Sequence, residues 1–158
     1  MDDLAIFENF HMVGYIEDKY STILSLATMS SMNNIYINDG INAIDINKSD
    51  YKIDVEEDKI KIILDLKATI KSLDTKFSLK EEKTFKWLEE HFSDLIKKEL
   101  ETSIQELRYY NSDVLGLGNK YYKKYPRKYY EDIGNEIGYE IKVNLNINKF
   151  GILFEVIE

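Results

Sequence analysis

The chain has 158 residues, of which 44% are hydrophobic and 32% charged, a balance typical of a soluble globular protein. Its formal net charge of −8 argues against general binding of nucleic acid, because phosphate contacts need a surplus of lysine and arginine. The lack of cysteine excludes disulfides, thiolate catalysis and cysteine-based metal centres. No linker or internal repeat divides the chain, so we predict a single domain over residues 1–158.

Membrane and export signals are not found in this sequence. No stretch approaches the roughly 20 apolar residues that a membrane span needs. The start, Met1-Asp-Asp, is acidic where a signal peptide would be basic. We therefore expect this chain to be a soluble polypeptide.

The first part of the chain predicts short elements. Residues 5–7 and 12–16 are two short apolar segments that indicate two strands or a hairpin. Residues 20–32 carry apolar side chains at helical spacing, which favours a short helix. From residue 34 the hydrophobic period becomes two, and this strand ends at the turn signal Asn38-Asp39-Gly40.

Two longer alternating segments follow, residues 44–55 and 60–70, with a polar turn between them. The second has the clearer pattern, with one face made of Ile60, Ile62, Leu64, Leu66, Ala68 and Ile70. Such alternation places one face on a core and leaves the other in water or against a partner, as in an antiparallel sheet.

A long helix is predicted next. Ser78-Leu-Lys-Glu81 has the spacing of a capping box at its start. Apolar residues then recur every three or four positions to about Tyr110: Phe85, Leu88, Phe92, Leu95, Ile96, Leu100, Ile104 and Leu107. A helix of this length spans roughly 45 Å.

The last third predicts two short helices and a strand. Asn111-Ser112-Asp113 offers an N-cap for a helix over residues 114–125, which must end before Pro126. Pro126 suits the first turn of another helix reaching about residue 133. Residues 139–147 alternate again as a strand of the same sheet. We therefore predict an α+β fold: a largely antiparallel sheet with one long and two or three shorter helices packed on one face.

The sequence shows no catalytic or metal-binding pattern. His91 lacks the Glu-x-x-His spacing of a helical metal site, so we expect it on the solvated surface of the long helix. The acidic runs do not follow the ligand order of a calcium loop. Gly116-x-Gly118 lacks the rest of a phosphate loop, so we expect close packing of a helix there, between Leu115 and Leu117. We predict no enzyme, no cofactor and no metal.

A basic and aromatic segment is the one local feature with a functional interpretation. Residues 120–128 contain five cations and no acid, interleaved with tyrosines: Lys120, Lys123, Lys124, Arg127 and Lys128, with Tyr121, Tyr122, Tyr125 and, just beyond, Tyr129 and Tyr130. Such a surface can bind anionic lipid headgroups or the acidic patch of a partner. Alternatively, the tyrosines are half-buried and lysine stems lie over them.

Several segments together resemble a known family. They are Ala5-Ile-Phe7, Met12-Val-Gly-Tyr15, the paired strands within residues 44–70, Asp113-Val-Leu-Gly-Leu-Gly118, Lys124-Tyr-Pro126, and the closing strand with Gly151. In this order they resemble the C-terminal region of the C subunits of spore germinant receptors, the GerAC or Ger(x)C family. Asn119 and Tyr129 stand where family members often carry glutamate and tryptophan.

The resemblance implies a non-catalytic domain of a spore germination lipoprotein. The intact subunit would lie on the outer face of the inner spore membrane, held by a lipid anchor absent from this chain, beside membrane-embedded A and B subunits. We expect this chain to be an excised C-terminal domain or a short relative. Its protein–protein contacts would involve the basic segment (Lys120, Lys123, Lys124, Arg127, Lys128, Tyr129) or the strand face with Asn144, Asn146 and Asn148.

Two other functions remain open from the sequence. A curved sheet on a long helix can enclose a small apolar ligand or a modest hydrolase-type pocket. A free-standing protein of the membrane surface is the other possibility.

Overall fold

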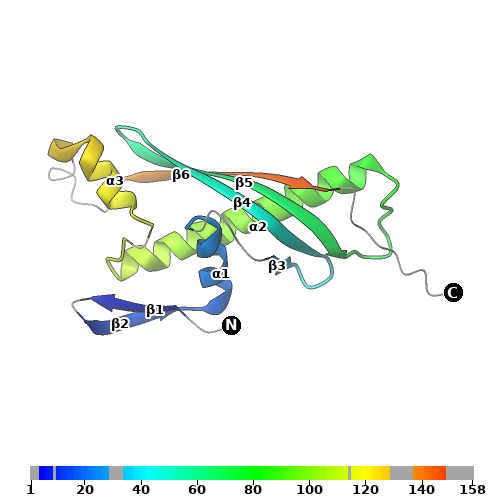
Figure 1. The fold of residues 1–158 in the computed structure, drawn as a ribbon, viewed down its shortest axis with the longest axis horizontal. Coiled ribbons are helices and arrows are strands. Elements are labelled where there is room, and N and C mark those ends of the chain that lie inside the picture. The colour runs from blue at the N-terminus through cyan, green and yellow to red at the C-terminus, as the bar shows by residue number, and fades with distance from the viewer. Residues whose placement is uncertain (1–3, 9, 29–33, 114, 129–136, 149–158) are drawn as a thin grey trace.

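The computed structural model describes residues 4–8, 10–28, 34–113, 115–128 and 137–148 (Figure 1). Its elements in chain order are β1 (Leu4–Glu8), β2 (His11–Ile16), α1 (Asp18–Leu26), β3 (Ile35–Asn38), β4 (Ala43–Val55), β5 (Lys59–Ser72), α2 (Glu82–Tyr109), α3 (Leu117–Lys124) and β6 (Gly138–Ile147). Residues 126–128 are helical as well, so Pro126 begins a new helix as predicted. The expected end of that helix lies outside the described residues.

The main sheet has four strands in the order β3-β4-β5-β6. The β3–β4 and β4–β5 pairs are antiparallel, whereas β6 joins the edge of the sheet parallel to β5. A parallel pair needs a long crossover between its strands, and here the crossover contains α2 and α3. The predicted α+β class with a largely antiparallel sheet is confirmed.

A β-bulge in β4 decides which side chains of this strand face the core. Ile46 pairs with Ala68 and Lys48 with Lys67, so Asn47 is the extra residue. Ile44 and Ile46 point inward before the bulge, and the inward set continues afterwards with odd-numbered residues such as Val55. The bulge therefore lets two alternating segments of opposite parity share one buried face.

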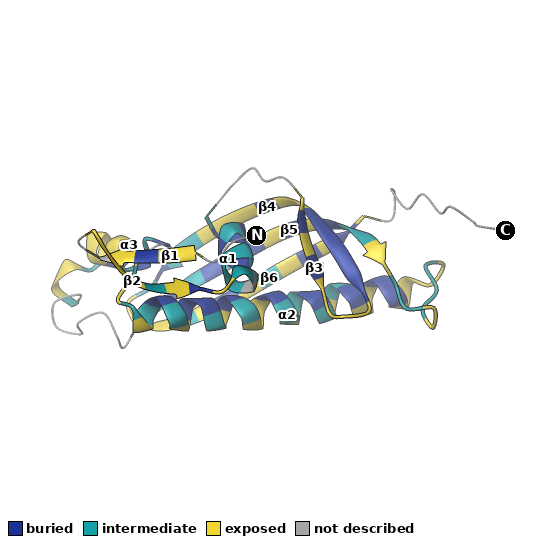
Figure 2. Cartoon of the chain, turned by 90° about the horizontal axis from the view of Figure 1, so that it is seen from below, coloured by how far each residue is buried: buried dark blue, intermediate teal, exposed yellow. Residues whose placement is uncertain are grey.

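The core lies between the sheet and α2. Figure 2 shows α2 running beneath the sheet with its buried residues turned toward it. The buried side chains of α2 are Thr84, Phe85, Leu88, Phe92, Ile96, Leu100, Ser103, Ile104 and Leu107. They meet the inward face of β5, where Ile60, Ile62, Leu64 and Ala68 are fully buried. Each such aliphatic side chain contributes roughly 1.5–3 kcal/mol relative to an exposed position.

The start of α2 differs from the sequence prediction. The helix begins at Glu82, and its N-cap residue Glu81 makes no side-chain capping hydrogen bond. The predicted capping box is wrong, because Ser78 is used in a turn: the amide of Lys80 donates to Ser78 Oγ at 3.3 Å, and the amide of Glu81 donates to the Ser78 carbonyl at 3.1 Å. A serine that satisfies a local turn does not cap a helix three residues later.

The N-terminal segments form a separate two-stranded sheet, β1–β2, which confirms the predicted hairpin. It packs beside the C-terminal end of α2 through Gly14, which faces the ring of Tyr110. A Cβ atom at Gly14 would overlap this ring, whose Cδ1 would lie 2.8 Å away. The missing side chain is therefore what allows the hairpin to approach the helix.

We expect Gly14→Ala to destabilise the domain by about 1–3 kcal/mol, because the new methyl group must displace the Tyr110 ring or the hairpin. The free energy of unfolding, measured by urea denaturation, checks this. Gly138→Ala is the matched control, since a Cβ there would meet its neighbours at ordinary distances of 3.8 and 3.9 Å. Equal stability of Gly14→Ala and the parent chain would contradict the proposed contact.

Candidate functional site

The basic segment begins at a turn that Asp113 and Gly116 build. Gly116 has a left-handed φ of 64°, which favours glycine, and α3 starts immediately after it. The Asp113 carboxylate accepts hydrogen bonds from the amides of Gly118 and Asn119, each at 3.0 Å. Asp113, four residues before Leu117, therefore caps the N-terminus of α3. The predicted start at residue 114 is wrong because the chain must first turn at Gly116.

The two glycines have different roles from the one predicted. A Cβ atom at Gly116 would meet nothing within 4 Å, so its backbone conformation, not close packing, explains the glycine. At Gly118 the approaching group is the Asp113 carboxylate, with Oδ2 3.3 Å from a would-be Cβ. Leu115 and Leu117 are both buried, as predicted.

Helix α3 is attached to the turn between β4 and β5. Tyr121 is fully buried and its hydroxyl donates to the carbonyl of Glu57 at 2.9 Å. Lys124 Nζ donates to the Val55 carbonyl at 2.5 Å, and Lys128 Nζ lies 2.8 Å from the Glu57 carboxylate. These contacts fix the basic segment against one end of the sheet.

The five cations therefore separate into two groups. Lys124 and Lys128 bind the β4–β5 turn and serve the fold. Lys120, Lys123 and Arg127 are exposed, and within the described part of the chain no hydrogen bond or ion pair holds their charged groups. The tyrosines divide similarly, because Tyr121 and Tyr125 turn inward while Tyr122 is 39% exposed. Tyr129, the sixth residue of the predicted surface, lies outside the described residues.

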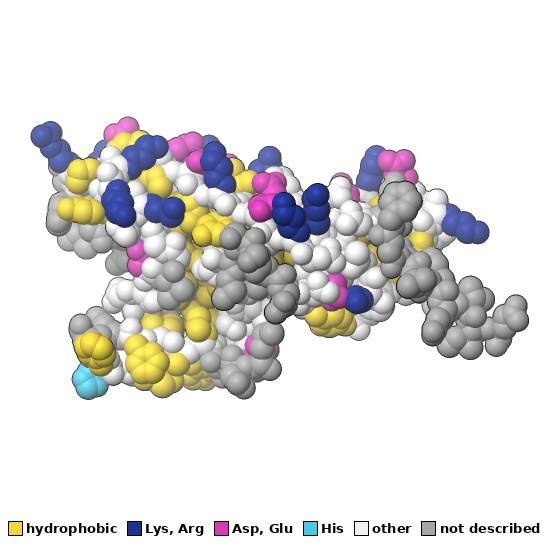
Figure 3. Space-filling view, in the orientation of Figure 1, with side chains coloured by type: hydrophobic (Ala, Val, Ile, Leu, Met, Phe, Trp, Pro, Cys, Tyr) yellow, Lys and Arg dark blue, Asp and Glu magenta, His cyan; other side chains and the backbone are white. Residues whose placement is uncertain are grey.

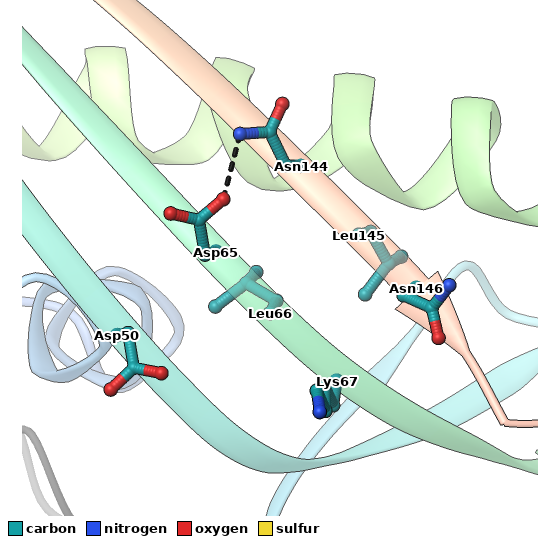
Figure 4. A pocket seen from close by; sticks show the side chains of 7 residues that line it. All are labelled: Asp50, Asp65, Leu66, Lys67, Asn144, Leu145 and Asn146. Carbon is teal, nitrogen blue, oxygen red and sulfur yellow. Dashed lines mark hydrogen bonds between the residues drawn. The ribbon is translucent and has the colours of Figure 1, made fainter.

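The second predicted surface is the open face of the sheet. Asn144, Asn146 and Asn148 are all exposed there, as the alternation of the last strand predicted. Asn144 Nδ2 donates to Asp65 Oδ1 at 2.8 Å, across the β5–β6 pair (Figure 4). A depression of about 390 Å³ surrounds this pair. It is lined by Asp50, Asp65, Leu66, Lys67, Asn144, Leu145 and Asn146.

Charges on this open face are arranged in rows across the strands. Asp50 lies directly opposite Asp65, and Lys48 lies directly opposite Lys67. Like charges in directly opposite positions destabilise a sheet. Lys48 relieves part of this cost by pairing with Asp50 at 2.6 Å along its own strand. The arrangement leaves acidic and basic groups open to an external partner.

The structure does not bring the two predicted surfaces together. Helix α3 sits at the β4–β5 turn, whereas Asn146 and Ile147 pair with Lys67 and Ala68 near the other end of β5. At about 3.3 Å per strand residue, they are separated by roughly 20–30 Å. A single small ligand cannot touch both, so they are independent surfaces.

His91 is partly exposed on α2, with 36% of its side chain accessible, in agreement with the predicted surface position, but it also pairs with Asp39. Its Nε2 lies 2.7 Å from Asp39 Oδ2, in the turn after β3, and its ring stacks on Trp87 at 4.7 Å between centroids. Asp39 Oδ1 also accepts the amides of Ile41 and Asn42, at 2.9 and 2.7 Å. No local sequence pattern indicates this pair, because 52 residues separate its members.

Asp39 is held in its charged form. Partial burial would raise the pKa of its carboxyl group, but hydrogen bonds from the side chain and amide of Asn42, the amide of Ile41 and the ring of His91 outweigh this effect. The pKa of Asp39 is therefore well below its usual range. The pair attaches the β3–β4 turn to α2.

An exposed apolar surface on the hairpin was not predicted. Phe7, Phe10, Met12 and Tyr15 are 64%, 100%, 58% and 56% exposed. Figure 3 shows hydrophobic side chains gathered over the hairpin at the lower left. Phe7, Met12 and Tyr15 lie in the predicted strands and Phe10 in the turn between them, but strand propensity does not tell which face another element covers.

The described residues contain neither a metal-binding cluster nor a membrane-spanning helix. Within the described ranges, no group of three or more His, Asp or Glu side chains is placed to hold a metal ion. None of the helices in the described residues combines the length and apolar character needed to cross a membrane.

Comparison with known proteins agrees with this architecture. A family described as "Spore germination B3/ GerAC like, C-terminal" matches residues 2–151. The crystal structure of the GerBC protein superposes with a TM-score of 0.63 at 18% identity, over 92% of this chain and 51% of that one. The chain thus spans about half the length of that relative, and at this identity the likeness shows the fold alone. No curated protein matches the sequence.

Fold and surfaces together define an α+β domain with one long helix under a mixed, mostly antiparallel sheet and with charged faces open to solvent. The chain belongs to the spore germination B3/GerAC-like C-terminal domain family. That family is not known as enzymatic.

We expect Asp39→Asn to lower the free energy of unfolding at pH 7 by about 1–3 kcal/mol, because the substitution removes a charged acceptor shared by several donors. Since the folded pKa is depressed, the carboxylate stabilises the fold above the unfolded pKa of about 3.9, and this contribution is lost as the pH falls below that value. Asp39→Asn should therefore lose less free energy of unfolding than the parent chain when the pH is lowered.

Urea denaturation at several pH values between 7 and 3 measures both effects. Asp58→Asn, at an exposed turn position, is the matched control. An Asp39→Asn chain with the stability and the pH slope of the parent would show that the turn is not attached in this way.

Proposed function

We propose that this domain is a non-catalytic part of the C subunit of a nutrient germinant receptor and acts through contacts with the membrane-embedded A and B subunits. Family membership supports a role in spore germination. The lipid anchor and the placement on the outer face of the inner spore membrane would belong to the intact subunit.

The observation that carries the proposal is the separation of the cations around α3. Two of them are used inside the domain, while Lys120, Lys123 and Arg127 stay exposed in a chain of net charge −8. Helix α3 is fixed against the sheet, so these three cations form a rigid surface. Such a surface can bind an acidic patch of a partner. Exposed charges of this kind mainly set partner choice and the rate of encounter.

A non-catalytic role also agrees with the chemistry of the site. Within the described residues, the segment offers ammonium, guanidinium and phenol groups, and the carboxylate that it contacts, that of Glu57, is paired with Lys128. The buried Tyr121 and the exposed Lys124 both donate to backbone carbonyls of the β4–β5 region and so serve the fold. Recognition of anionic groups is what this arrangement can do.

Replacing Lys120, Lys123 and Arg127 together by glutamate in the full-length gene should strongly reduce both the retained receptor complex and the nutrient-triggered release of dipicolinic acid. The reason is that repulsion replaces attraction at the contact. The two readouts are copurification of the subunits from spore membranes and dipicolinic acid release, with a gene deletion as the reference for complete loss.

Lys80, Lys97 and Lys98, changed together to glutamate, are the matched control, since they are exposed and produce the same change in net charge. A receptor-independent trigger should still release dipicolinic acid in every strain. Normal assembly and normal germination in the first variant would overturn this contact. Lys124 is left unchanged, because it donates to the Val55 carbonyl. A loss of assembly in a Lys124 variant could therefore come from a weakened fold.

A second candidate is binding of a small polar ligand on the open sheet face. The depression at Asp65 and Asn144 favours it, since it gathers carboxylates, amides and Lys67 within about 390 Å³. Against it, the depression is open to solvent, whereas most small-molecule sites are enclosed.

A thermal-shift screen of small metabolites tests the second candidate, because a ligand that binds only the folded chain raises the melting temperature with its concentration. A ligand of the depression should lose its effect in Asp65→Asn and keep it in the exposed control Asp58→Asn. A screen with no hit, or hits that Asp65→Asn leaves unchanged, would reject this site.

A further inference from the structure

The outer edge of β6 is open. β6 is the last strand of the main sheet, and no described strand pairs with its far side. It is ten residues long, contains no proline, and pairs with β5 without a register shift. Natural proteins commonly protect such edges with prolines, bulges or short strands. This edge has none of these devices along its length.

Two hydrogen bonds show which residues of β6 face that edge. The amide of Asn148 donates to the Ala68 carbonyl at 2.8 Å, toward β5. The amide of Ile147 donates instead to the Glu89 carboxylate of α2 at 2.9 Å. Alternate residues of a parallel strand direct their backbone groups to the same side. Val143 and Leu145 therefore present their amides and carbonyls to the same edge as Ile147.

Glu89 occupies the position of a neighbouring strand at Ile147. Its carboxylate accepts a backbone amide that a strand carbonyl would otherwise accept. The end of the edge is thus closed by a side chain, whereas the stretch around Val143 and Leu145 lies in a groove of about 500 Å³ beside α2.

The helix side of this groove is acidic. Its lining from α2 is Glu89, Glu90, Ser93 and Asp94, opposite Val143, Asn144 and Leu145. Glu90 and Asp94 are exposed and one helical turn apart, and none of the described lysines or arginines pairs with them. Lys97, the next cation along α2, interacts electrostatically with Glu140 on β6. The groove therefore combines unpaired strand groups with two exposed carboxylates that form no ion pair among the described residues.

We propose that this groove binds an extended polypeptide segment that adds a strand to β6 and carries lysine or arginine at alternate positions. In an added strand every second side chain would face α2, where Glu90 and Asp94 lie. The backbone bonds to Val143 and Leu145 would supply affinity, and the charges would select the partner. This surface is separate from the cations of α3.

The test uses the 158-residue chain and three fluorescein-labelled nine-residue peptides. One alternates lysine with threonine, one has glutamate in place of each lysine, and one has the composition of the first with its lysines grouped at one end. Fluorescence anisotropy measures the Kd at low and at physiological salt. The alternating lysine peptide should bind, more weakly at higher salt, and the other two should bind at least about tenfold more weakly.

Two double variants test whether the peptide binds in the groove. Glu90→Lys with Asp94→Lys should raise the Kd of the alternating peptide at least about tenfold. The control pair Asp58→Lys with Glu82→Lys, which changes the net charge equally at exposed positions away from the groove, should change it by less than about twofold. Because these side chains are on the surface, folding is not at risk.

Strand addition itself is tested by amide hydrogen exchange. The amides of Val143 and Leu145 should become protected when the alternating peptide binds. The proposal is overturned if the alternating peptide does not bind, if the grouped or glutamate peptide binds equally well, if Glu90→Lys with Asp94→Lys changes nothing, or if these amides stay unprotected. None of these outcomes depends on the germinant receptor, so they are independent of the proposed function.

Discussion

The packing of α2 against the inward face of β5 and β6 is the interaction on which the rest of the structure depends. A helix of 28 residues is about 42 Å long and a strand of 14 residues roughly 46 Å, so one helix covers the sheet along its length (Figure 2). Because α2 returns the chain along the sheet, β6 can pair parallel to β5. Arg108, near the end of α2, fixes this return through Nη2 to the Ile137 carbonyl at 2.5 Å and by lying over the Tyr139 ring.

Because α2 covers one face of the sheet, the other face and part of the β6 edge are left uncovered by the described residues. The open face carries the charged rows around Asp65 and Lys67, and the β6 edge carries the acidic groove of Glu90 and Asp94. At the β4–β5 turn, α3 presents Lys120, Lys123 and Arg127. The acidic groove and the exposed cations of α3 therefore lie on separate surfaces of this domain of the spore germination family.

The sequence predicted the parts of the fold that depend on periodicity. The alternation in β5 and β6 and the three-and-four spacing in α2 identified the buried faces, because one face of each element must be apolar. The GerAC resemblance and the α+β class were recognised on the same segments, and both are confirmed. The helix start at Ser78 was predicted wrongly because Ser78 satisfies a local turn, and the start at residue 114 because the chain turns at Gly116 before α3 begins.

The sequence by itself determined the order of elements, their buried faces and the concentration of cations in residues 120–128, since these follow from local composition and spacing. Tertiary structure alone decided which charges are used internally. Lys124 and Lys128 differ from Lys123 and Arg127 only in reaching the β4–β5 turn, 69 residues away from Lys124 along the chain. The Asp39–His91 pair and the groove at β6 arise in the same way, from residues that meet only when α2 lies across the sheet. Such contacts depend on distance in space, which no local pattern of side chains records.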